Sequence, residues 1–191
     1  MEDLINRVKN ILLTPKSEWL TIEEENYPHA KVFTSYILLL ALIPAVACFI
    51  GYGLIGVHGY TSFTIALKMA VIQFVTMVVS TYVAAFVINF LARNFGATEN
   101  FDHAYSLVAY AYTPALVAGV LYIIPALKDL VSLASLYSLY LLYVGLTPMM
   151  KTPQEKQTSY FIVSLLVMAL AIILLSFLFT VLLIGNAYRM F

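Results

Sequence analysis

The strongest constraint on the fold is a series of uncharged apolar runs. Residues 69–92 and 104–127 contain no charged side chain, and residues 157–188 form a run that is longer still. A helix needs about 20 apolar residues to cross a hydrocarbon core of about 30 Å. The chain is 62% hydrophobic and only 10% charged, whereas a soluble domain usually has about 25% charged residues. The sequence therefore predicts a polytopic α-helical membrane protein.

These runs predict an all-α transmembrane bundle of five spans with an amphipathic helical arm at the N-terminus. We expect the arm over residues 1–30 and the membrane domain over residues 31–191. The five spans are expected at residues 32–57, 64–92, 104–127, 130–148 and 157–188. The fifth run exceeds the length that a perpendicular span needs, so this helix must tilt or project at one end.

The arm has the pattern of an amphipathic helix. Apolar residues return to one helix face at Leu4, Ile5, Val8, Ile11 and Leu12. Thr14 and Pro15 interrupt this helix and begin a second short one, which carries Trp19. Trp19 is the only tryptophan and is expected as an anchor at the lipid headgroups. Two interpretations stay open: the arm lies on the membrane surface or docks a partner, or it packs on the cytosolic ends of the bundle.

The third span is expected to be the central one. Ala111, Ala115 and Gly119 follow one another at intervals of four residues, which places three small side chains on one helix face. Small residues let a second transmembrane helix approach closely. Pro114 lies in the same stretch and removes a backbone hydrogen bond, so a kink or a partner must compensate. We therefore expect the other spans to pack around this one.

Polar side chains lie within the second and fourth spans. Gln73, Thr76 and Ser80 share one face of the second span, and the fourth span carries Ser135, Ser138 and Tyr140. One interpretation is that these groups hydrogen-bond to neighbouring helices, where each bond contributes about 0.6 kcal/mol on average. The other is that they line a polar cavity or a path for a solute.

Residues for catalysis or for binding of a metal or cofactor are not expected. All ten carboxylates lie outside the predicted spans, and the three histidines lie at span ends, far apart in sequence. Proton relays and ion-coupled pumps usually need a carboxylate near the midplane, and no histidine spacing resembles a zinc site. Asp102 and His103 begin the third span, and they either cap the helix or form a functional pair. The formal net charge is zero, so we expect no nucleic-acid partner.

The distribution of cations predicts the orientation. Seven Lys and Arg residues lie on the N-terminal side of the five spans: Arg7, Lys9, Lys16, Lys31, Arg93, Lys151 and Lys156. The other side has only Lys68, Lys128 and Arg189. Because cytoplasmic segments carry the excess of Lys and Arg, we expect a cytoplasmic N-terminus and a C-terminus on the opposite side of the membrane.

The segment AYSLVAYAYTPALVAGVL, residues 104–121, resembles the core motif of the Yip1-domain family. The positions that match this motif are Tyr105, Ser106, Tyr110, Tyr112 and Pro114. Three further segments resemble bacterial members: RVKNILLTPKSEW (7–19), ALIPAVACFIGYGLIG (41–56) and LYLLYVGLTPMMKTPQEK (139–156). The resemblance implies five spans and a cytosolic N-terminus, and it names no catalytic residue. Eukaryotic members are linked to vesicle transport, Rab-type GTPases and membrane shaping, but this sequence lacks their long cytosolic N-terminal region.

We therefore expect a non-enzymatic, multi-pass protein of the bacterial inner membrane. Its expected partners are the lipid bilayer, a second copy of itself or other membrane proteins, and its expected role is in membrane organisation or a trafficking-like process. The alternative is a transporter or channel for a small neutral or lipid-like solute, which would use the polar side chains of the second and fourth spans.

Overall fold

The computed structural model describes residues 2–55 and 63–187, and nearly all of these residues are helical. The elements are α1 (Glu2–Leu13), α2 (Pro15–Glu25), α3 (His29–Val32), η1 (Phe33–Ile37), α4 (Leu38–Ile50), η2 (Gly51–Ile55), α5 (Phe63–Ala92), η3 (Arg93–Phe95), α6 (Phe101–Ala111), α7 (Thr113–Ala118), η4 (Gly119–Ile123), η5 (Pro125–Leu127), α8 (Lys128–Met150) and α9 (Gln154–Ala187). The elements η1 and η2 are π-helical turns, and η3, η4 and η5 are 3₁₀ turns.

Four helical segments among the described residues are long and apolar enough to cross a membrane. They are His29–Gly53, Phe63–Phe95, Phe101–Ile123 and Asp129–Met150. These segments correspond to the first four predicted spans. The end of the first prediction, at residue 57, and the end of the fifth, at residue 188, lie outside the described residues. The helix α9 occupies the region of the fifth prediction.

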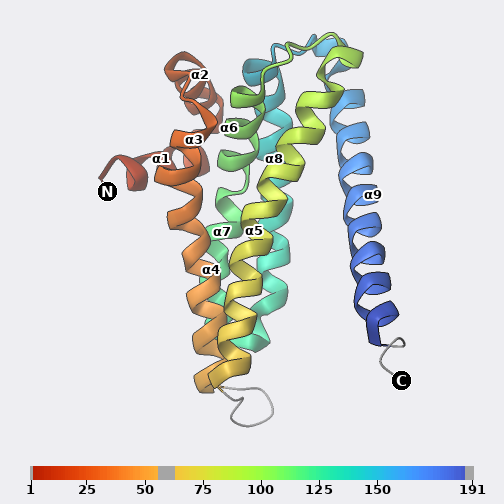
Figure 1. Ribbon diagram of the computed structural model, residues 1–191. Coiled ribbons are helices and arrows are strands. Elements are labelled where there is room, and N and C mark those ends of the chain that lie inside the picture. Colours follow the sequence, from red (N-terminus) through yellow and green to blue (C-terminus); the bar gives the residue numbers. More distant parts are fainter. Residues whose placement is uncertain (1, 56–62, 188–191) are drawn as a thin grey trace.

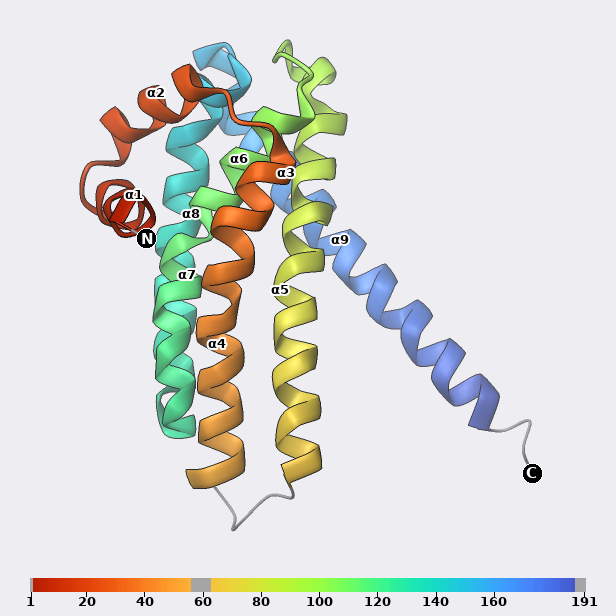
Figure 2. The same ribbon diagram turned by 60° about the vertical axis from the view of Figure 1, so that its left-hand side comes forward.

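The four segments run side by side as an up-and-down bundle, as Figures 1 and 2 show. The helices α1 and α2 lie at the end of the bundle where α5 ends and α6 begins. The helix α9 starts at this same end and diverges from the bundle along its length (Figure 2). The third segment is the most buried, with 56% of its apolar window inside the structure against 44% or less in the other three. It is therefore the central helix of the bundle, as expected.

The third segment is not one continuous helix, which corrects the prediction of a single helix over residues 104–127. The helix α6 ends at Ala111, and α7 begins at Thr113 with Pro114 in its first turn. Proline cannot donate a backbone hydrogen bond. The Thr113 hydroxyl donates instead to the carbonyl of Tyr110, at 2.6 Å. After Gly119 the chain continues as 3₁₀ turns, so the regular helix ends earlier than predicted.

Small residues bring the first and third segments into close contact. A Cβ atom added to Gly119 would lie 2.5 Å from the Cβ atom of Pro44, which is inside α4. Gly119 is one of the three small residues predicted to form a contact face. Ala111 is fully buried, and Ala115 is partly buried. Gly51 of the first segment is as close to the third, since a Cβ atom added there would lie 2.0 Å from the backbone oxygen of Tyr122. Close packing between these segments therefore depends on two glycines, Gly119 and Gly51.

Candidate functional site between the N-terminal helices and the bundle

Trp19 attaches the N-terminal helices to the bundle. Its side chain is fully buried, between Leu107 of α6 and Gly145 of α8. A Cβ atom on Gly145 would lie 2.7 Å from Trp19 Cε2 and 2.5 Å from Leu107 Cδ1. The predicted anchor at the lipid headgroups is therefore wrong, because a glycine in the fourth segment leaves room for the indole ring inside the protein.

Arg7 joins α1 to α2 through two partly buried ion pairs. Its Nη1 donates to the carboxylate of Glu18, and its Nη2 donates to both carboxylate oxygens of Glu25 at 2.6 and 2.5 Å. The Arg7 and Glu18 side chains are only 15% and 8% exposed. Burial by itself would lower the pKa of Arg7, but the hydrogen bonds and charge of Glu25 outweigh it, so the pKa is raised. Arg7 therefore stays charged.

The guanidinium of Arg7 also lies over the central helix. Its Cζ atom is 5.7 Å from the centre of the Tyr110 ring, within range of a cation–π interaction. The Tyr110 ring contacts the ring of Tyr36 edge-on, with centroids 4.6 Å apart. Thr113 uses its proton on a backbone carbonyl, so Tyr36 donates to the Thr113 hydroxyl at 2.7 Å. These contacts connect α1, the first segment and the break in the third.

A cavity of about 800 Å³ lies among these groups. It lies between α1 and α2 on one side and the beginning of the first segment on the other. Its wall includes Arg7, Glu18, Glu25, Lys31, Tyr36 and Tyr110. This volume is in the range of small-molecule sites, which usually measure about 300–1,000 Å³. The sequence analysis expected two short helices here but missed this site, because it did not place them relative to each other or to the bundle. The useful signal was a basic residue before the Thr14–Pro15 break and acidic residues after it.

A second polar cluster lies at the same end of the bundle. Asp102 Oδ1 accepts from the backbone N–H of His29 at 2.8 Å and lies 2.6 Å from His29 Nδ1. His103 does not pair with Asp102. Its ring nitrogens lie 2.8 Å from Asn26 Oδ1 and 2.8 Å from a carbonyl in the last turn of α8. The side chain of Asn100, rather than that of Asp102, caps α6. The two residues thus connect α6 to α2, α3 and α8.

The comparison with known families decides what kind of protein carries this architecture. A family model of the Yip1 domain matches residues 9–185. This chain belongs to the Yip1-domain family. It is similar to the inner membrane protein YohC of Escherichia coli strain K12, with 29% identity over 128 residues. The YohC protein of E. coli O6:H1 matches equally well. The match covers 63% of this chain and 65% of each relative, and no solved structure matches.

The residues of the Yip1 motif lie at the centre of the structure. Tyr105 and Ser106 are buried in α6, and Tyr110 joins the Arg7 site described above. Tyr105 contacts the ring of Tyr82 on α5, with centroids 4.8 Å apart, and its hydroxyl has no hydrogen-bond partner among the described residues. Tyr112 is partly buried at the break between α6 and α7. The Yip1 motif of this protein thus lies in the third membrane-length segment, which is the most buried of the four.

The six polar residues predicted along the second and fourth segments lie in different surroundings. Ser80 and Ser135 donate to carbonyls of their own helices, and Ser138 is buried without a partner among the described residues. Thr76 is exposed, Gln73 is partly buried and Tyr140 is 44% exposed. None of the six lines either the Arg7 cavity or the apolar groove between α4 and α5. No observation on this Yip1-domain protein therefore favours a solute path through them.

Proposed function

We propose that this protein is a non-enzymatic organiser of the bacterial inner membrane that works through helix–helix contacts with itself or with other membrane proteins. The observation that carries the proposal is the position of α9. The helix α9 diverges from the bundle along its length (Figure 2), and apolar side chains on it, such as Leu166 and Leu170, are exposed. Family membership and the similarity to an inner membrane protein support the location.

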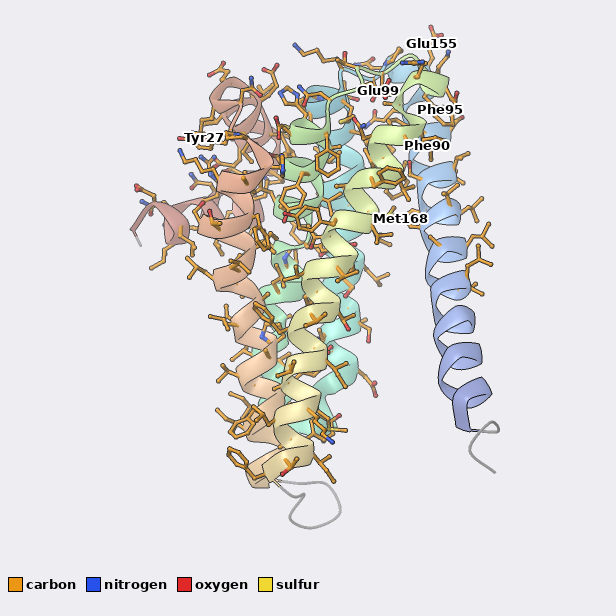
Figure 3. The ribbon with its side chains drawn as sticks, viewed as in Figure 1. Tyr27, Phe90, Phe95, Glu99, Glu155 and Met168 are labelled. Carbon is orange, nitrogen blue, oxygen red and sulfur yellow. The ribbon has the colours of Figure 1, made fainter. Side chains whose placement is uncertain are left out.

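The contact between α9 and the bundle is short. The Tyr160 hydroxyl donates to the carbonyl of Ile88 at 2.5 Å, and the Tyr160 ring stacks on Phe95 with centroids 5.0 Å apart. Two turns further on, Met168 still packs partly buried against the core (Figure 3). The opposite face is open: Leu166 is 64% exposed and Leu170 is 55% exposed. In a bilayer this face is available to a second helix, which it would contact by close packing.

The proposal includes five spans, with α9 as the fifth, and a cytoplasmic N-terminus. The seven predicted cytoplasmic cations belong to α1, α2, α3, η3 and the segment around the beginning of α9, all of which lie at one end of the bundle (Figure 1). Lys68 lies near the beginning of α5, at the opposite end. This asymmetry supports the orientation through the excess of cations on the cytoplasmic side. On this view α1 and α2 form a cytosolic arm that packs on the bundle.

The absence of catalysis is also part of the proposal. The ionisable side chains Arg7, Glu18 and Glu25 are engaged in ion pairs with one another. Among the described residues, no group of three metal-ligating side chains is placed to hold a metal ion.

Cysteine crosslinking in native membranes tests the contact role. The single native cysteine is removed as Cys48→Ser, and Leu166→Cys is compared with Phe86→Cys. Both positions are apolar and exposed, at 64% and 62%, but Phe86 lies on α5 within the bundle. We expect a bifunctional maleimide to link Leu166→Cys to a second copy or to another membrane protein, and to leave Phe86→Cys unlinked. Equal linking at both positions, or linking at neither, would contradict the proposal.

The orientation is tested separately by labelling whole cells with a membrane-impermeant maleimide. Lys16→Cys on α2 should be protected, and Thr64→Cys at the beginning of α5 should react, both in the Cys48→Ser background. Both positions are exposed in the structure. The reverse result would place the N-terminal helices outside the cell.

A further inference from the structure

We propose that the Arg7 cavity binds the headgroup of an ammonium-bearing phospholipid, with phosphoethanolamine as the matching chemistry. The cavity lies between α1, α2, the beginning of the first segment and Tyr110, and holds about 800 Å³. Four features carry the proposal: its charges, the Tyr110 hydroxyl, its aromatic walls and its position beside the apolar surface.

The cavity wall carries charges of both signs. Asp3, Glu18 and Glu25 contribute carboxylates, and Arg7 and Lys31 contribute cations. Arg7 is already bound by two of the carboxylates, so the excess charge on the wall is negative. A zwitterionic ligand can place its ammonium against this excess and its phosphate against Lys31. A purely anionic headgroup would have only Lys31 as a free counter-ion and would be repelled by the carboxylates.

The Tyr110 hydroxyl faces the cavity without a partner among the residues that the structure describes. The side chain is 5% exposed and forms part of the cavity wall. No hydrogen bond to its hydroxyl is found among the described residues, although Tyr36 beside it is bonded to Thr113. The hydroxyl is therefore free to donate a hydrogen bond to a phosphate oxygen in the cavity.

Aromatic rings already hold cations at this site. The Lys31 ammonium lies 3.3 Å from the centre of the Tyr27 ring, and the Arg7 guanidinium lies over Tyr110. Figure 3 shows Tyr27 at the α2 end of the bundle, where the cavity lies. Tyrosine rings next to carboxylates are a suitable environment for an ammonium group.

The position of the cavity favours a lipid over a soluble ligand. Its wall includes Leu39, an exposed apolar residue that lies inside the first membrane-length segment. The helix α1, which forms the other wall, also exposes Ile5. A headgroup in the cavity can therefore continue into acyl chains along Leu39 without leaving the bilayer.

Native mass spectrometry of the purified full-length protein tests the proposal. The protein is placed in micelles that contain equal amounts of phosphatidylethanolamine and phosphatidylglycerol with identical acyl chains. We expect one phosphatidylethanolamine to be retained, with a preference of about tenfold over phosphatidylglycerol. Equal retention, or a preference for phosphatidylglycerol, would overturn the proposal. Displacement of the lipid by an equal concentration of soluble glycerophosphoethanolamine would also overturn it, because the ligand would then be a soluble amine.

Tyr110→Phe is the decisive variant. It keeps the ring beneath Arg7 and removes only the hydroxyl, so the fold should be retained and retention of phosphatidylethanolamine should fall about tenfold, as expected when a hydrogen bond to a charged group is lost. Lys31→Gln should reduce retention to a similar degree. The matched control is Tyr105→Phe, which removes the hydroxyl of a neighbouring tyrosine on the same helix that does not line the cavity. Equal retention in Tyr110→Phe and Tyr105→Phe would contradict the assignment.

Discussion

Replacement of Gly145 gives the sharpest test of how the N-terminal helices dock. A methyl group at this position would lie 2.5 Å from Leu107 and 2.7 Å from the Trp19 ring, where carbon atoms normally stay about 3.5–4.0 Å apart. Both neighbours are fully buried, so neither has free space to move into. Overpacking of this kind typically costs about 1–3 kcal/mol.

The free energy gained by burying Trp19 opposes the strain at Gly145. A buried tryptophan removes about 150–250 Å² from water, which at about 25 cal/mol per Å² corresponds to about 4–6 kcal/mol. The strain in Gly145→Ala is smaller than this value, so we expect α2 to stay docked while the melting temperature falls. Gly145→Leu adds three further carbon atoms to a site without space. We expect its strain to exceed the docking energy and to release α2.

Trp19 reports the result directly because it is the only tryptophan in the chain. In Gly145→Leu its emission should shift to longer wavelength, and quenching by acrylamide should rise several-fold. Ser135→Leu is the control, because it adds a similar side chain at an exposed position of the same helix. Circular dichroism confirms that the variants remain helical. A folded Gly145→Leu protein with wild-type emission and quenching would refute the described packing of Trp19.

Three further substitutions test other contacts by thermal unfolding in detergent. Arg7→Met should reduce the free energy of unfolding by about 3 kcal/mol, because it leaves two poorly exposed carboxylates without their cation. Adding Glu18→Gln and Glu25→Gln to this variant should recover most of the lost stability. No recovery would contradict the ion-pair network. Gly119→Ala should cost about 1–3 kcal/mol, because the added methyl meets the rigid proline of α4; unchanged stability would exclude the close approach. Tyr160→Phe should lower the free energy of unfolding by about 1 kcal/mol, because the hydrogen bond from Tyr160 to α5 is lost. The beginning of α9 should also become easier to cleave with protease. Equal cleavage of the variant and the wild type would argue against this attachment.

The sequence predicted the parts of the fold that depend on apolar length and small residues. The second span was expected at residues 64–92 and is found at Phe63–Ala92, because a long apolar run bounded by polar residues has little freedom in where it enters and leaves lipid. The contact at Gly119 followed from residue spacing along a helix. The break after Ala111 was only partly foreseen, since Pro114 indicated that a partner was needed but did not identify the Thr113 hydroxyl.

The candidate site could not be predicted, because its residues meet only in three dimensions. Asp102 and His29 are 73 positions apart in sequence, and no periodicity relates them. The prediction for Trp19 followed the statistical preference of tryptophan for the membrane interface. That preference does not take into account that Gly145 on another helix leaves room for the indole ring. The ion pairs of Arg7 depend on how the chain turns between α1 and α2, and this turn sets which faces meet.

The burial of Trp19 also constrains the order in which the protein assembles during synthesis. The N-terminal helices leave the ribosome first, yet the surface that receives Trp19 is made by Leu107 and Gly145, which are translated much later. At about 5–20 residues per second, α2 must wait on the order of ten seconds before it can dock. Docking of α2 on the bundle is thus a late step of biogenesis, and any factor that binds the nascent N-terminus must release it before α2 can dock.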